Sequence, residues 1–191
     1  MAKVIVHGVP LQVDGVAPGG AELRQIAATL ELLPPSHLRH LPTITVGDRP
    51  PRGGGGSAHA GLPGGPYLRL NRTVFDPRER PVNAGAFNYT LLHECGHLVD
   101  WAYGCMPWLR RYDPIGYAAL LAHPHRGATQ GEGEHYADAY ADYFWVPRVR
   151  SGAPMRQSRP PVAIDPRMRA VLNSPAFRAA WAELIGELIS R

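Results

Sequence analysis

Cysteine, long apolar runs and blocks of like charge are all scarce in this chain of 191 residues. The only two cysteines are Cys95 and Cys105, which excludes a fold held together by a framework of disulfides. No apolar run approaches the roughly 18 residues that a membrane-spanning helix needs, so we expect no membrane association. The net charge is +4 without blocks of like charge, so we expect no nucleic-acid partner.

The beginning of the chain also lacks the pattern of a signal peptide. One lysine precedes a short apolar stretch that His7, Gly8 and Pro10 soon interrupt. We therefore expect synthesis to end in the cytoplasm, unless a non-classical route exports the protein. Nothing in the sequence indicates an oligomeric state.

Glycine and proline, in contrast, are abundant. There are 21 glycines and 20 prolines, which favours short elements and long loops. With 45% hydrophobic residues, a chain of this length can bury a core of its own. The composition predicts a single domain over residues 1–191, with a sheet and helix part at about 1–104 and a helical part at about 105–191.

Alternation of apolar and polar residues predicts the strands. Residues 3–13 read as a strand or small hairpin with Asp14-Gly15 as the turn signal, and 43–47 and 67–70 as further strands. The glycine-rich segment 49–57 is interpreted as a surface loop, with a mobile flap near a functional site as the alternative.

The sequence predicts four helices, at 20–33, 84–103, 132–146 and 175–190, and the first and last show the helical spacing of apolar residues. Asn83 and Gly104 are the expected ends of the second helix, and Pro147 is expected to end the third. Residues 105–130 are expected to be irregular. The fold class is α+β, with a small mixed sheet packed on the first two helices and a C-terminal helical part.

A His-Glu-x-x-His pattern carries the chemistry of the second helix. His93 and His97 are four residues apart and project from one helix face, so both imidazoles can reach one Zn²⁺ ion. Glu94 points about 100° to the side, where it can take a proton from a water molecule held by the metal.

The third ligand must come from elsewhere in the chain. Glu134 and Asp138 are four apart on the next helix, so Glu134 can ligate the metal while Asp138 accepts the free N–H of a ligating imidazole. His135 is the second choice of ligand, followed by Asp138 itself or the segment 123–125.

Other residues near these motifs favour structural roles. Asp100 can accept a hydrogen bond from an imidazole or cap a neighbouring segment, whereas Cys95 is expected to be a small packing residue. Tyr136, Tyr140 and Tyr143 follow helical spacing and are expected to pack.

The two motifs, separated by 134 − 97 = 37 positions, resemble the gluzincin type of zinc metallopeptidase. More closely, residues 91–100 with 134–140 resemble the compact catalytic domain of anthrax lethal factor and the related Pro-Pro endopeptidases. The resemblance spans about residues 66–146. It implies a minimal zincin-like fold, zinc bound by His93, His97 and Glu134, and Glu94 as the general base.

One position departs from that family. A tyrosine seven residues before the ligand glutamate stabilises the oxyanion there, and Gly127 occupies that position here. Tyr112, Tyr117, His123 and His125 are the nearby candidates for an oxyanion donor, and the sequence does not choose among them.

The expected function is a zinc-dependent endopeptidase that binds one Zn²⁺ and hydrolyses peptide bonds in extended protein segments. By the resemblance, the substrate would lie along an edge strand, for which residues 67–70 are the candidate. The alternatives are a non-catalytic or regulatory zinc-binding module, and a secreted toxin-like effector protease with the same chemistry.

Overall fold

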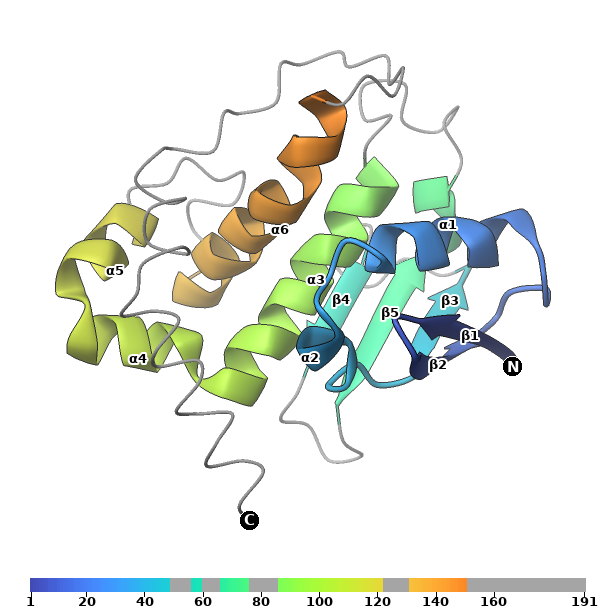
Figure 1. The fold of residues 1–191 in the computed structure, drawn as a ribbon, viewed down its shortest axis with the longest axis horizontal. Helices are drawn as coiled ribbons and strands as arrows, with labels where there is room; N and C mark the ends of the chain where they lie inside the picture. The colour runs from blue at the N-terminus through green and yellow to red at the C-terminus, as the bar shows by residue number, and fades with distance from the viewer. Residues whose placement is uncertain (49–55, 60–65, 76–85, 122–130, 151–191) are drawn as a thin grey trace.

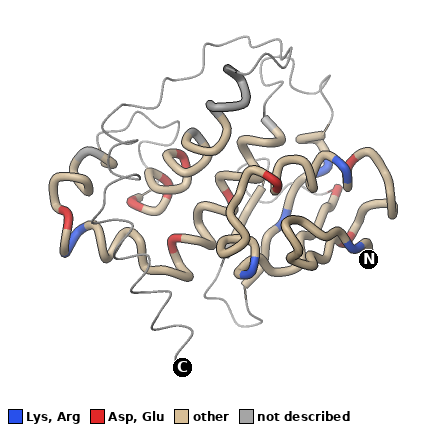
Figure 2. Tube along the Cα trace, viewed as in Figure 1, with Lys and Arg blue, Asp and Glu red and all other residues tan. Residues whose placement is uncertain are grey.

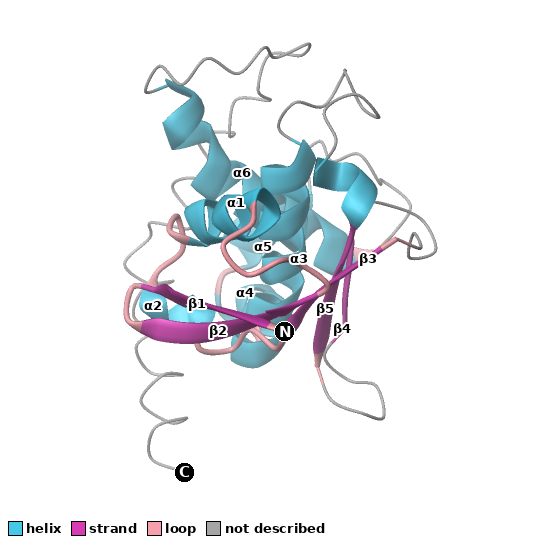
Figure 3. Cartoon of the chain, turned by 90° about the vertical axis from the view of Figure 1, so that its right-hand side faces the viewer, coloured by secondary structure: helices cyan, strands magenta, loops and turns pink. Residues whose placement is uncertain are grey.

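A computed structural model describes residues 1–48, 56–59, 66–75, 86–121 and 131–150. These residues form an α+β structure in which helices lie over one face of a five-stranded mixed sheet (Figure 3). The α+β class expected from the sequence is therefore confirmed. None of the helices in the described ranges combines the length and the hydropathy that crossing a bilayer requires.

A β-hairpin begins the chain, as predicted. Strands β1 (Ala2–Val6) and β2 (Val9–Asp14) pair antiparallel and are joined at His7 and Gly8, whose φ angles are +50° and +78°. Two consecutive residues with positive φ match the right-handed twist of a hairpin. Asp14-Gly15 therefore follows the hairpin rather than joining its strands.

The sheet order is β1-β2-β3-β5-β4 (Figure 1). The two edge strands are therefore β1 and β4, and β5 lies inside the sheet. Strands β3 (Ile44–Gly47) and β5 (Tyr67–Asn71) pair in parallel, and β4 (Gly56–His59) pairs antiparallel to β5. The strand predicted at 67–70 is confirmed as β5, but its expected edge position and the loop expected to reach residue 57 are wrong. Backbone pairing with β5 places the glycine-rich segment's last residues in a strand, although they lack strand-forming side chains.

Helices α1 (Ala21–Leu30) and α3 (Ala86–Tyr103) pack against the sheet (Figure 1). The first is shorter than the predicted 20–33 and is followed by the short helix α2 (Pro35–Leu38). The predicted end of α3 at Gly104 is confirmed, because that glycine has a φ of +62°. The expected cap Asn83 lies outside the described residues.

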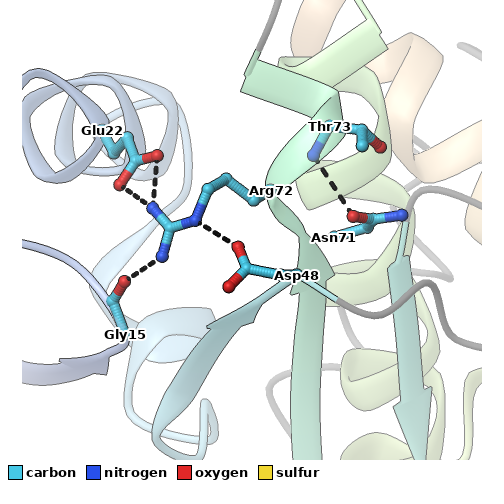
Figure 4. A network of polar contacts seen from close by, with 6 residues as sticks. All are labelled: Gly15, Glu22, Asp48, Asn71, Arg72 and Thr73. Atoms are coloured by element: carbon cyan, nitrogen blue, oxygen red, sulfur yellow. Dashed lines mark hydrogen bonds and ion pairs between the residues drawn. The ribbon is translucent and has the colours of Figure 1, made fainter.

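An arginine at the start of the 3-10 helix η1 (Arg72–Phe75) links α1 to the ends of β2 and β3 (Figure 4). Arg72 donates from Nη1 to the Glu22 carboxylate at 2.6 and 2.7 Å, and from Nε to Asp48 at 2.7 Å. Its Nη2 donates to the Gly15 carbonyl at 2.6 Å. One side chain thus fixes the ends of β2 and β3 and the start of α1.

Two helices occupy the first part of the segment that was expected to be irregular: α4 (Cys105–Tyr112) and α5 (Pro114–Leu121). That prediction is wrong because Pro107 and Pro114 lie in first turns, where a backbone N–H has no helical partner to lose. Residues 122–130 lie outside the described ranges.

Helix α6 (Glu132–Arg150) lies beside α3 (Figure 1). It begins where predicted but continues past Pro147, so the end predicted at that proline is wrong. A proline inside a helix costs about 3 kcal/mol through one lost hydrogen bond and a clash with the preceding turn, and that cost does not end this helix. Gly96 faces Ala137 across the helix pair, and an added Cβ at Gly96 would lie 2.9 Å from the Ala137 Cα. The predicted helix at 175–190 lies outside the described residues.

Candidate metal centre

The His-Glu-x-x-His pattern lies on α3, and its two histidines share one face of that helix. Their Nε2 atoms are 3.1 Å apart, and the rings meet edge to face with centroids 4.7 Å apart. The spacing of four residues therefore places two nitrogen lone pairs at a common point between α3 and α6.

Glu134 on α6 completes a triangle with these histidines. Its Oε2 lies 3.2 Å from His93 Nε2, and its Oε1 lies 3.4 Å from His97 Nε2. Among the residues that the structure describes, His93, His97 and Glu134 form the group that could hold a metal ion, and His135 is not part of it.

The size of this triangle suits a small divalent ion. Tetrahedral zinc with bonds of about 2.05 Å requires neighbouring ligand atoms to lie about 3.3 Å apart. The two Nε2 atoms are 3.1 Å apart, and each has one Glu134 oxygen nearby: Oε2 at 3.2 Å from His93 and Oε1 at 3.4 Å from His97. One ligand atom from each of the three residues can be chosen so that all lie within 4.8 Å of one another. Two imidazoles and one carboxylate are also ordinary zinc ligands, so both the geometry and the chemistry of this donor set fit the ion.

The electrostatics of the triangle favour a positive charge at its centre. Burial opposes protonation of His93, but the hydrogen bonds to Asp138 and Glu134 outweigh it and raise the pKa of His93 to about 9. The same histidine contacts hold the pKa of Glu134 well below its usual range. Figure 2 shows acidic residues on α3 and along the first part of α6.

Asp138 lies one turn beyond Glu134 on α6 and touches the far side of His93. Its Oδ1 accepts a hydrogen bond from His93 Nδ1 at 2.8 Å, and the Asp138 residue is only 5% exposed. The contact holds the proton on Nδ1 and points Nε2 at the triangle, where a metal ion that displaces the Nε2 proton would meet the lone pair. The same Oδ1 also accepts a hydrogen bond from the hydroxyl of Tyr89 at 2.5 Å.

Glu94 lies next to the triangle but outside it, and strand β4 covers it. It is 7% exposed, and the backbone of Ala58 donates a hydrogen bond to its carboxylate. Burial raises the pKa of Glu94 above its ordinary value. Gly56 leaves room for this side chain, since an added Cβ would lie 2.9 Å from both Cγ and Oε1 of Glu94.

The sequence did not point to Ala58 or Tyr89, and it pointed to Gly56 only through the alternative of a flap at 49–57. Tyr89 precedes His93 by four residues, so helical spacing could have placed it on the histidine face. No sequence signal identifies Gly56 or Ala58, because their role depends on how β4 packs over α3.

The neighbouring residues take mostly structural positions. Of the two interpretations of Asp100, the structure shows the cap, because Asp100 accepts the backbone N–H of Met106 at 2.7 Å. Cys95 is fully buried, and Tyr136 and Tyr140 are buried in the core, as expected.

Two of the four candidate oxyanion donors are described. Tyr112 is 60% exposed and packs on Trp108, and the Tyr117 hydroxyl donates to Glu132. His123, His125 and Gly127 lie outside the described residues.

Comparison of the chain with protein-family models, with curated proteins and with solved structures found no match. The interpretation of this centre therefore depends on the residues themselves and on their geometry.

Proposed function

We propose that the protein is a zinc-dependent endopeptidase with a minimal zincin-like fold. The observation that supports this most strongly is the triangle of His93, His97 and Glu134, which brings two imidazole nitrogens and a carboxylate close enough together to hold one ion. Within the described ranges no fourth His, Cys, Asp or Glu joins the group. Three protein ligands and one remaining position are typical of catalytic zinc, whereas structural zinc has four protein ligands.

Zinc bound at this triangle would supply Lewis acidity, which polarises a carbonyl and makes water more acidic. Glu94 takes the proton of the water that attacks the scissile carbonyl and passes it to the departing amine. Its burial raises its pKa, so the carboxylate is a stronger base than an exposed glutamate. Asp138 keeps His93 oriented throughout, because it is buried and hydrogen-bonded to Nδ1.

Strand β4 is the proposed docking edge for the substrate. It ends the sheet and contacts α3 beside Glu94. An extended peptide can pair with the open side of an edge strand through backbone hydrogen bonds, which requires no particular side chains. Such pairing would deliver a peptide bond of an unfolded or loop segment to the base, so the substrate class is an extended protein segment.

The test is digestion of a peptide library by the zinc-loaded protein, read by mass spectrometry. Glu94→Gln is the matched control, because it keeps the side-chain volume and removes the base. We expect cleavage within peptides by the wild type and almost none by the variant. Zinc binding without any cleavage would overturn the peptidase assignment and favour a non-catalytic zinc-binding module. Equal cleavage by both proteins would remove Glu94 from the mechanism.

A further inference from the structure

A tyrosine hydroxyl shares the acceptor oxygen that orients one of the proposed zinc ligands. Asp138 Oδ1 accepts from the hydroxyl of Tyr89 and also from His93 Nδ1. Tyr89 and His93 lie one turn apart on α3, whereas Asp138 reaches them from α6. Both hydrogen bonds therefore cross the same helix interface and end on one atom.

The ring of Tyr89 also limits where the His93 imidazole can lie. The two rings are 6.1 Å apart between centroids with planes 30° apart, and His97 meets the other side of His93 edge to face. Movement of the His93 ring is thus restricted by a ring contact on either side and by Asp138 at Nδ1.

The buried carboxylate has two acceptor oxygens, and its rotation decides which one faces His93. A second donor on Oδ1 opposes that rotation, because turning the carboxylate would break both hydrogen bonds at once. A fixed acceptor in turn keeps the Nε2 lone pair of His93 on the line toward Glu134 and His97.

We propose that Tyr89 is a positioning residue of the metal centre, which acts through Asp138 on the orientation of His93. This inference rests on the proposed function, because it assigns Tyr89 to the support of the same zinc site. Tyr89 touches neither the substrate nor the reacting atoms in this role.

The experiment measures zinc dissociation constants by competition with a chromophoric chelator at one fixed pH. The proteins are the wild type, Tyr89→Phe, Asp138→Ala and the double variant. Phenylalanine keeps the ring contact with His93 and removes only the hydroxyl. We expect Asp138→Ala to weaken zinc binding about 10–100-fold. Tyr89→Phe should weaken it about three- to tenfold in the wild type and have no further effect in Asp138→Ala.

Tyr103→Phe is the control for the general loss of a tyrosine hydroxyl. The Tyr103 hydroxyl donates to the Ser36 carbonyl at 3.1 Å, at the other end of α3. This variant should bind zinc as the wild type does, even if its melting temperature falls. The inference is overturned if Tyr89→Phe binds zinc as tightly as the wild type does. It is also overturned if Tyr89→Phe weakens zinc binding by the same factor in the wild type and in Asp138→Ala.

A measurement on the metal-free protein separates this inference from the proposed function. The His93 Nδ1 proton gives a low-field nuclear magnetic resonance signal while Asp138 accepts it, and the signal should be absent in Asp138→Ala. In Tyr89→Phe that oxygen loses the competing hydroxyl donor, so the hydrogen bond from His93 should strengthen and the signal should move further downfield. If the wild type binds no zinc, the proposed function fails and this signal alone decides the role of Tyr89. An unchanged signal overturns it.

Discussion

Replacement of Gly56 by alanine should impair the base without impairing the metal site. An added Cβ would lie 2.9 Å from Cγ and Oε1 of Glu94 and 3.0 Å from Cγ2 of Thr90. Ordinary contacts between such atoms are about 3.5 Å or longer, so roughly half an ångström of movement is required. The Glu94 side chain is the more mobile neighbour and will take up that movement.

The size of the effect follows from the sensitivity of catalysis to distance. A displacement of about 1 Å costs roughly a hundredfold in rate, so half of that displacement should cost roughly tenfold. Zinc affinity should stay unchanged, because the atoms nearest to the new methyl group belong to Glu94 and Thr90 and not to the three proposed ligands.

The assay compares kcat on a cleaved library peptide with the zinc content of the same samples. Gly133→Ala is the matched control on α6, because its Cβ would lie 3.8 Å from Nδ1 of His97, an ordinary contact. It should keep both activity and zinc. Full activity in Gly56→Ala would refute the argument that β4 positions Glu94. Loss of zinc in that variant would show that the metal site depends on β4.

Three further predictions concern individual side chains. Glu94→Gln should retain zinc and lose several orders of magnitude in kcat, as measured by single-turnover kinetics. Glu134→Ala should reduce zinc occupancy in elemental analysis, and full occupancy would place the third ligand elsewhere. Burial, aided by His40, lowers the pKa of His37 from 6.5 to about 4, so folding favours the neutral ring. The contribution of this ring to the free energy of unfolding is therefore complete above pH 6.5 and decreases as the pH falls toward 4. Between pH 7 and pH 5, urea unfolding should show that the free energy of unfolding falls about 2 kcal/mol more in the wild type than in His37→Gln. Glutamine is the control because it can keep the hydrogen bond to Tyr140. Equal losses would contradict this reasoning.

The helices of this protein were the more predictable part of its fold. The sequence located α1, α3 and the start of α6. Helix α1 buries one stripe of side chains against the core, whereas α6 buries the consecutive residues 136–141. The sequence did not predict strand β4 or the two short helices α4 and α5, and the reasons are opposite. Glycine-rich sequence carries no strand signal, and prolines in a first turn imitate the signal of a loop.

The candidate ligands could be derived from the sequence because metal chemistry restricts residue types and helical geometry restricts their spacing. His93 and His97 are related by one helix turn, so no tertiary information is needed to bring them together. Tyr89 on α3 matters through its contact with α6, and Gly56 on β4 matters through its contact with α3. Such contacts depend on the distance between elements, which the order of residues in one chain does not specify.

The distance between α3 and α6 is set at a position inside the His-Glu-x-x-His motif itself. Gly96 lies between Cys95 and His97 on α3, and α6 approaches so closely there that a methyl group would lie 2.9 Å from the Cα of Ala137. The adjoining residue on α6 is Asp138, which reaches His93, and Glu134 lies one turn earlier. Because small residues let two helix backbones approach, Gly96 and Ala137 bring the carboxylates of α6 within reach of the imidazoles of α3. The two unspecified positions of His-Glu-x-x-His are therefore not equivalent here: Cys95 fills the core, and Gly96 determines whether the triangle can close.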